Sequence, residues 1–108
     1  MLKGKTAIVT GGSRGIGEAI VYKLASMGAD IALIYVGNSE IALNVCNNVT
    51  EKFNVKCISY NCDVSDFNLV KETIGQIKAD FGGVNILVNN AGITNIAIVI
   101  IPVAKFPS

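Results

Sequence analysis

The glycine-rich stretch Thr10–Gly17 follows a short apolar run and precedes an apolar stripe at helical spacing. This order predicts a strand, a tight turn and a helix, the arrangement with which α/β proteins hold the pyrophosphate of a dinucleotide. Backbone N–H groups at the start of the helix point at the anion, and the helix dipole adds about 0.3–1 kcal/mol. Glycine is required because a Cβ would hold the phosphate away or forbid a positive φ. The stretch therefore predicts a nucleotide site.

The spacing of these glycines leaves a second interpretation open. Gly11, Gly15 and Gly17 form the pattern G-x-x-x-G-x-G, which differs from the G-x-G-x-x-G fingerprint of many dinucleotide-binding proteins. Taken alone, the stretch is also compatible with a tight turn that binds nothing.

Composition favours a single α/β domain. The 108 residues are 51% hydrophobic and 16% charged, an excess that is typical of parallel strands buried on both faces. The net charge of +1 gives no support to nucleic-acid binding. The longest apolar runs, 31–36 and 96–101, are far shorter than the ~20 residues of a membrane span. We therefore expect neither nucleic acid nor a membrane among the partners.

The cysteines predict a reducing compartment. Cys46, Cys57 and Cys62 form no C-x-x-C pair, and the chain has no histidine. An odd number of cysteines in a chain whose first residues lead straight into a strand, with no room for a signal peptide, favours reduced thiols in the cytoplasm. We interpret the three as core-filling residues and expect no metal site. Mechanisms that need a histidine base are excluded.

Strands and helices alternate with short connections, which predicts βαβ units and a parallel sheet. The predicted strands are 6–10, 31–35, 55–60 and 86–88. The first predicted helix runs from about Gly15 to Ser26 with Gly28 as its C-cap, and the second from 39 or 40 to about 54. The third begins at a Ser65 cap and ends at Gly82. Its apolar residues recur at the clearest helical spacing, at 67, 70, 74, 77 and 81.

Three motifs in this order carry a resemblance to a known family. They are Thr10–Gly17, Asp63-Val64 after the third predicted strand, and Asn89-Asn90-Ala91-Gly92 after the fourth. Their order and spacing resemble the short-chain dehydrogenase/reductase family, and within it most of all the 3-oxoacyl-acyl-carrier-protein reductases of fatty-acid synthesis. The resemblance covers residues 1–94, which we predict to be an NADP-binding Rossmann half-domain; residues 95–108 form a divergent tail. It implies an α/β fold, a truncated Rossmann-like doubly wound parallel sheet of about four strands in the order 3-2-1-4, with three helices.

The resemblance also implies roles for individual residues. The pyrophosphate and the adenosine ribose would be wrapped by Gly11, Gly12, Ser13, Arg14, Gly15, Ile16 and Gly17. Asp63 would accept a hydrogen bond from the adenine amino group, with the backbone of Val64 beside it. Asp63 also fits a purely structural role ahead of a helix, and both roles can hold together. Asn89 would tie the central strands together, while Asn90, Ala91 and Gly92 would pass under the adenosine toward the nicotinamide ribose.

The choice between NAD and NADP rests on the end of the second predicted strand. An NAD-selective site places an acid there to bind the ribose 2′-hydroxyl, but residues 35–39 read Tyr-Val-Gly-Asn-Ser. Arg14 can reach a 2′-phosphate with bidentate geometry, and Val36, Asn38 and Ser39 would complete the pocket. The alternative is a solvated surface arginine. The expected cofactor is NADP(H).

The residues that this family uses for proton transfer are missing. The family pairs a tyrosine with a lysine four residues later, so that the ammonium lowers the phenol pKa from about 10. Four residues after Tyr22, Tyr35 and Tyr60 stand Ser26, Ser39 and Val64. No catalytic residue can be assigned, and the chain alone is expected to lack turnover.

We therefore predict the cofactor-binding part of an NADP-dependent short-chain oxidoreductase, cut short or diverted after about Thr94 by an early stop or a shifted reading frame. The alternative is a non-catalytic nucleotide-binding module that acts with a partner chain. A methyltransferase-type domain is disfavoured because it too needs an acid after the second strand.

The fourth predicted strand would lie at an exposed edge, with one sheet face bare. Such a face favours self-association or a partner chain. The run 96–101 is expected either beside this strand or over the bare face.

Overall fold

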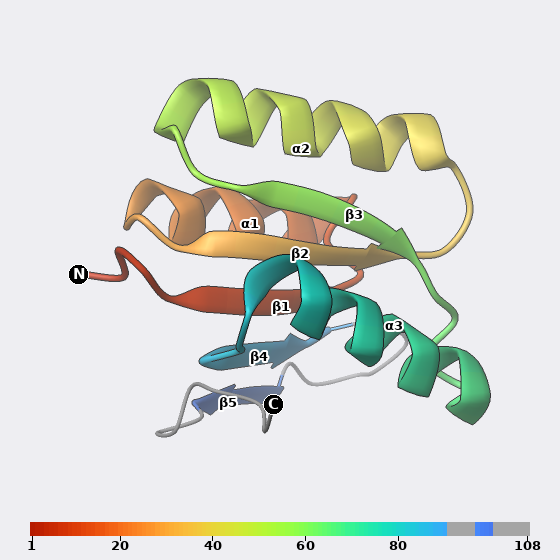
Figure 1. Cartoon of the computed structure of the whole chain (residues 1–108). Helices are drawn as coiled ribbons and strands as arrows, with labels where there is room; N and C mark the ends of the chain where they lie inside the picture. The colour runs from red at the N-terminus through yellow and green to blue at the C-terminus, as the bar shows by residue number, and fades with distance from the viewer. Residues whose placement is uncertain (91–96, 101–108) are drawn as a thin grey trace.

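The computed structural model describes residues 1–90 and 97–100, which form a single layered α/β unit (Figure 1). Strands and helices alternate through the first seven elements. They are β1 (Thr6–Thr10), α1 (Gly15–Ser26), β2 (Asp30–Tyr35), α2 (Ser39–Phe53), β3 (Cys57–Asn61), α3 (Phe67–Phe81) and β4 (Ile86–Asn89), followed by β5 (Ala97–Ile100).

The described strands form one sheet in the order β3-β2-β1-β4-β5. Strands β1 to β4 are parallel, with Val9 opposite Leu33 on one side and Val88 on the other. This confirms the predicted Rossmann-like sheet, its 3-2-1-4 order and its three helices. Because the strands are parallel, the segments that follow β1, β2, β3 and β4 all leave from the same edge.

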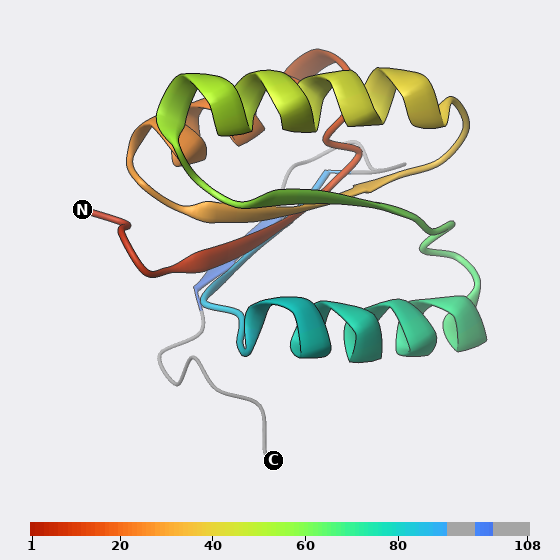
Figure 2. The ribbon, with the colours of Figure 1, turned by 45° about the horizontal axis from the view of Figure 1, so that its top comes forward.

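The two faces of the sheet are covered by different helices. Helices α1 and α2 pack on one face, and α3 packs on the other (Figure 2). Every residue of β1 is buried, as expected for a central strand. Ile31 and Leu33 of β2 are fully buried under α1 and α2, and burial of each such side chain contributes about 1.5–3 kcal/mol.

The start of α3 differs from the prediction. Its N-cap is Asp66 and not Ser65, because Asp66 Oδ1 accepts a hydrogen bond from the Leu69 N–H at 3.1 Å. The Ser65 hydroxyl instead donates to Asp63 at 2.7 Å. The predicted end is confirmed, since Gly82 caps the helix with a φ of 83°.

Other boundaries shift by one or two residues. Strand β2 begins at Asp30, and β3 begins at Cys57 rather than at residue 55. Asp30 Oδ1 accepts from the Lys56 N–H at 2.8 Å, so the N–H of the residue before β3 is bonded to a side chain, while its carbonyl accepts from the Ile31 N–H of β2. Helix α1 has Met27 as its C-cap, and Gly28 follows it with a φ of 99°.

The fourth strand is not at an edge. Strand β5 pairs with β4 in the antiparallel sense, with Val88 opposite Ile98. Of the two placements expected for the run 96–101, the one beside the fourth strand is therefore confirmed. Antiparallel pairing lets the chain return to β4 without the crossover helix that a parallel neighbour needs.

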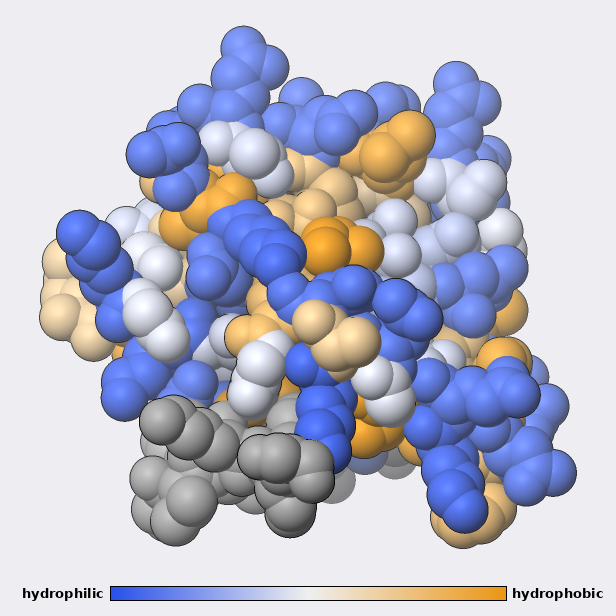
Figure 3. All heavy atoms as spheres, viewed as in Figure 1, coloured by the Kyte–Doolittle hydropathy of each residue, from blue (hydrophilic) through white to orange (hydrophobic). Residues whose placement is uncertain are grey.

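The α3 face retains apolar surface. Figure 3 shows apolar residues reaching the surface at several separate places among hydrophilic ones on this side of the molecule. Among the helices that the structure describes, none has the length and apolar character of a membrane span.

Candidate cofactor-binding site

The turn between β1 and α1 has a backbone that requires glycine. Gly11 and Gly15 have φ values of 66° and 55°, a region that residues with a Cβ rarely adopt. Helix α1 begins directly after Arg14, which is extended, and no side chain within the described residues caps this helix. Its first N–H groups therefore have no side-chain acceptor, which suits an incoming anion.

The other two glycines of the stretch serve packing. A Cβ on Gly17 would lie 2.0 Å from the Gly11 carbonyl oxygen, and one on Gly12 would lie 2.9 Å from a methine carbon of Leu33. The Gly12 N–H donates to the Ile34 carbonyl at 3.2 Å. These contacts hold the start of α1 close to the ends of β1 and β2.

A groove of about 840 Å³ opens beside this turn. Its walls come from the β1–α1 turn and from the segments that follow β2 and β3. Two exposed apolar side chains belong to it, Val36 at 64% and Val64 at 40% exposed. The lining residues are Gly11, Ser13, Arg14, Ile34, Tyr35, Val36, Gly37, Cys62, Asp63, Val64 and Ser65.

Asp63 is the carboxylate of this groove. Its Oδ1 accepts from the Ser65 N–H at 3.0 Å and from the Ser65 hydroxyl at 2.7 Å. These bonds, first the backbone one and then the hydroxyl one, lower the pKa of the Asp63 carboxyl below its usual value. Asp63 is therefore an anionic acceptor in a fixed turn at neutral pH.

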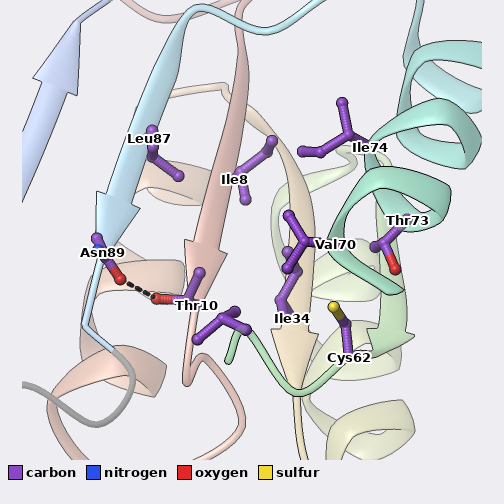
Figure 4. A pocket seen from close by; sticks show the side chains of 10 residues that line it. Ile8, Thr10, Ile34, Cys62, Val70, Thr73, Ile74, Leu87 and Asn89 are labelled. Carbon is purple, nitrogen blue, oxygen red and sulfur yellow. Dashed lines mark hydrogen bonds between the residues drawn. The ribbon is translucent and has the colours of Figure 1, made fainter. Parts of the chain in front are cut away.

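The ends of β1 and β4 are joined by polar side chains. The Thr10 hydroxyl donates to Asn89 Oδ1 at 3.2 Å and accepts from the Asn90 N–H at 2.8 Å. Asn90 Nδ2 reaches the Gly11 carbonyl at 3.5 Å. The expected role of Asn89 in tying the central strands is confirmed by its bond to Thr10 (Figure 4).

A second, mostly apolar cleft of about 200 Å³ lies between α3 and the sheet. Figure 4 shows Val70 and Ile74 of α3 on one side, with Ile8, Ile34 and Leu87 on the strands. Ile34, Cys62 and Val64 line both hollows, so the cleft adjoins the groove. Thr10 and Asn89 supply the polar groups at the strand ends.

Most of the predicted site residues meet at this edge of the sheet. Gly11, Ser13, Arg14, Val36, Asp63 and Val64 line the groove, Gly15, Ile16 and Gly17 form the start of α1, and Gly12 packs beneath it. Asn90 contacts the turn. Asn38 is the N-cap of α2, where its Oδ1 accepts from the N–H groups of residues 40 and 41. Ala91 and Gly92 lie outside the described residues.

The sequence did not single out Thr10, Cys62 or Ser65 as site residues. Thr10 is the last residue of β1, and Ser65 is two residues beyond Asp63, a spacing typical of an aspartate turn. That spacing could have predicted that Ser65 donates hydrogen bonds to the Asp63 carboxylate. Cys62 lines the groove only because β3 ends beside β2, which residue type alone does not indicate.

None of the three tyrosines is placed as an activated proton donor. Tyr22 packs edge-on against Phe53, and Tyr35 is buried under α1 and α2. Tyr60 donates to Asp80 at 2.6 Å, and burial together with this bond raises the pKa of Tyr60. A tyrosine acid needs the opposite shift.

Comparison with known proteins gives a family for this arrangement. Residues 5–102 match the sequence model of the short chain dehydrogenase family. The sorbose reductase SOU1 of Candida albicans is 47% identical over 92 residues, which cover 85% of this chain and 32% of that protein. The 3-oxoacyl-[acyl-carrier-protein] reductase FabG of Staphylococcus epidermidis is 41% identical over 90 residues, which cover 83% and 36%.

A solved structure shares the fold as well. The L-sorbose reductase of Gluconobacter frateurii, crystallised with NADPH and L-sorbose, superposes with a TM-score of 0.80 at 35% identity, over 87% of this chain and 35% of that one. The chain thus spans about a third of the length of the curated relatives that it matches.

Proposed function

Because this chain belongs to the short-chain dehydrogenase family, we propose that its groove binds NADP(H) for the reduction of a carbonyl compound. The family uses a nicotinamide dinucleotide, and the chain carries the cofactor-binding part of such an oxidoreductase. The observation that carries the proposal is the uncapped start of α1, which opens beside a groove lined by Arg14.

The pyrophosphate is held at the start of α1. Gly11 and Gly15 give the turn its positive φ values, and the N–H groups of Ile16 and Gly17 begin the helix. A phosphate there accepts N–H bonds that no side chain takes up within the described residues, and it meets the positive end of the helix dipole. Gly17 allows this approach because the Gly11 carbonyl fills the space that a Cβ would need.

The adenosine occupies the groove between the ends of β2 and β3. Val36 and Val64 offer the exposed apolar surface that a flat base needs, and Asp63 has an oxygen that Ser65 does not use for an exocyclic amine. Asn90 contacts the turn before α1, and the family resemblance assigns it, together with Ala91 and Gly92, to binding toward the nicotinamide ribose.

The preference for NADP(H) over NAD(H) comes from charge. Val36 to Ser39 contain no acid that would repel a 2′-phosphate. Arg14 lines the same groove, and its guanidinium has the geometry to bind a phosphate with two hydrogen bonds. Asn38 uses its Oδ1 to cap α2, which leaves its amide NH₂ to donate to the phosphate. Two observations, a cation in the groove and the absence of an acid among residues 36–39, thus favour the phosphorylated cofactor.

The substrate is proposed from the relatives. Two of them are a sorbose reductase and a 3-oxoacyl-[acyl-carrier-protein] reductase, and reduction of either substrate adds a hydride to a carbonyl carbon. We favour the thioester and a role in fatty-acid synthesis, since the motifs at 10–17 and 86–94 resemble that group most. Nicotinamide supplies the hydride when bound. The chain has no Tyr-x-x-x-Lys, so these 108 residues bind the cofactor without reducing ketones.

The test is a fluorescence titration of NADPH and of NADH into the purified chain, with a carbonyl-reduction assay alongside. Arg14→Ala is expected to weaken NADPH binding by about 1.5–3 kcal/mol, roughly 10–150-fold, with a smaller effect on NADH binding. Asn38→Asp keeps the α2 cap but adds a carboxylate, so it should also weaken NADPH selectively. Lys71→Ala is the control, because Lys71 is an exposed residue of α3 outside the groove.

Three results would contradict the proposal. Absence of saturable NADPH binding would show that the groove is not a cofactor site. Equal losses of affinity for NADPH and NADH in Arg14→Ala would show that Arg14 does not bind the 2′-phosphate. Sustained ketone reduction by the homogeneous chain would contradict the inference that it lacks a proton donor.

The apolar cleft against α3 supports a second candidate, a nucleotide-binding module that associates with another chain. Leu87 and Ile74, which line the cleft and are only partly buried, would gain burial from a helix laid over them. Gel filtration with bound NADPH distinguishes the two candidates. A defined dimer or complex favours the module, and a monomer that binds NADPH favours the first proposal.

A further inference from the structure

Two of the three cysteines meet where α2 packs on the edge strand β3. The Cys57 thiol donates a hydrogen bond to Cys46 Sγ at 3.0 Å. Cys46 lies in α2 and is 3% exposed, whereas Cys57 is the first residue of β3 and partly exposed. Cys62 is buried in the core on the other face of the sheet. The chain therefore holds one close thiol pair and one separate thiol.

We propose that Cys46 and Cys57 form a redox modification site, at which a small-molecule disulfide converts the two thiols into an intramolecular disulfide. A disulfide has an S–S length of about 2.05 Å, so the two sulfur atoms need to approach by only about 1 Å. Strand β3 ends the sheet, so this movement is taken up at the margin and not among the central strands.

The two thiols differ in solvent exposure and in acidity. Cys57 is the one that a reagent reaches from solvent. The hydrogen bond from Cys57 lowers the pKa of Cys46 against the opposing effect of burial, and the Ser59 hydroxyl adds to the lowering. The same bond and burial raise the pKa of Cys57. Cys46 is thus the readier thiolate and Cys57 the accessible sulfur.

The reaction is a pair of thiol–disulfide exchanges. Cys46 first loses its proton to solvent. Cys57 then passes its own proton to the Cys46 thiolate along their hydrogen bond and attacks one sulfur of the reagent, whose S–S bond breaks as one reagent thiol leaves with a proton from solvent. Cys46 loses this second proton to solvent and attacks Cys57 Sγ, and the bond between Cys57 and the reagent breaks as the second reagent thiol leaves, again with a proton from solvent. Two protein thiols are oxidised to one disulfide, and one reagent disulfide is reduced to two thiols.

The new bond should stiffen the chain without closing the cofactor groove. It would link α2 to β3 across the loop 46–57, and neither cysteine lines the groove. Closure of a loop of this size raises the unfolding midpoint by roughly 10–20 °C. NADPH affinity should stay within about twofold of the reduced chain, since no lining group of the groove changes.

The experiment equilibrates the folded chain in glutathione buffers of rising disulfide content. It then unfolds the chain at low pH to expose the buried thiols, traps the free ones with a maleimide and measures the mass of the products. The expected result is a fall from three reactive thiols to one, a mass lower by two hydrogen atoms and no intermolecular dimer. Cys62→Ser is the matched control and should still form the bond. Cys46→Ser should stop at a glutathione adduct on Cys57.

A comparison in urea makes the test independent of the proposed cofactor site. Because the bond fits the native fold, half-oxidation in urea should need a more oxidising glutathione ratio than half-oxidation of the folded chain. Retention of three thiols, cross-linking through Cys62, or equal ratios in both states would each overturn the proposal.

Discussion

The three described helices begin in two different ways. Asn38 and Asp66 cap α2 and α3: Asn38 Oδ1 accepts two backbone N–H groups, and Asp66 Oδ1 accepts one. Helix α1 follows Arg14, and among the residues that the structure describes no side chain takes that place. A cap contributes about 1 kcal/mol, so α1 gives up stabilisation that its neighbours have. What it gains is a set of N–H groups available to a ligand beside the groove.

The three starts also differ in how closely the chain is packed. All three helices begin at exposed residues, but the third residue of α1, Gly17, is buried against the Gly11 carbonyl. The third residues of α2 and α3, Ile41 and Leu69, are only partly buried. Helix α1 therefore depends on neighbouring backbone for its position, and the capped helices depend on their own side chains. This difference predicts which substitutions affect ligand binding and which affect stability alone.

The largest effect is expected from Gly17→Ala. The added methyl would lie 2.0 Å from the Gly11 oxygen and 2.7 Å from Asn90 Nδ2, so α1 must move. We expect a loss of about 2–4 kcal/mol of unfolding free energy and loss of NADPH binding, measured by urea unfolding and fluorescence titration. Gly75→Ala is the control, because a Cβ there meets open space. Equal behaviour of the two variants would contradict the close packing.

The predictable part of the fold lies where one local signal dominates. The turn at Gly11 and Gly15 needs positive φ values, which the glycines predict. The spacing of the apolar residues in α3 predicts a single helix over that segment. The α3 cap was not, because Ser65 and Asp66 are both good caps and only the turn at Asp63 decides between them.

Features that depend on distant contacts were less accessible. The return of β5 beside β4 was one of two placements that the apolar run allowed, and pairing decides it. The meeting of Cys46 with Cys57 requires α2 to pack on β3. No spacing rule in the chain indicates that these two sulfurs, and not Cys62, share a contact.

Arg14→Asp would make α1 resemble the capped helices. The backbone of Arg14 is extended, with φ −147° and ψ 159°, which suits an aspartate cap. We expect the unfolding free energy to rise by about 0.5–1 kcal/mol, while NADPH affinity falls by roughly 100-fold because a carboxylate replaces the guanidinium and competes for the same N–H groups. Opposite changes in stability and binding are the signature. Parallel changes would show that the open helix start has no part in binding.

Removal of the existing caps should affect stability alone. Asp66→Ala is expected to lower the unfolding free energy by about 1 kcal/mol and to leave NADPH affinity unchanged. Ser65→Ala is the informative partner, since it removes the residue that the sequence favoured as the cap. Ser65→Ala should lower the unfolding temperature less than Asp66→Ala does. A larger loss in Ser65→Ala would show that Ser65, and not Asp66, is the N-cap of α3.

The smallest effect concerns the charge of Asp63. Its pKa is lowered by the bonds from Ser65, so its stabilising contribution is present above the unfolded pKa and is lost as the pH falls through the lower folded value. Carboxyl chemical shifts followed by NMR should give a titration midpoint below the ordinary 3.8. Ser65→Ala removes the hydroxyl bond but keeps the backbone N–H, so the midpoint should move only part of the way back. A midpoint at or above 3.8 in the unmodified chain would mean that the turn after β3 does not hold this carboxylate, and the groove would lose its fixed acceptor for an adenine amine.

Between pH 5 and 8 Asp63 should stay ionised, so its contribution to stability should not change in that range. The effects of the variants at the start of α1 do not depend on a titrating group, so they should persist at acid pH, where the contribution of Asp63 is lost.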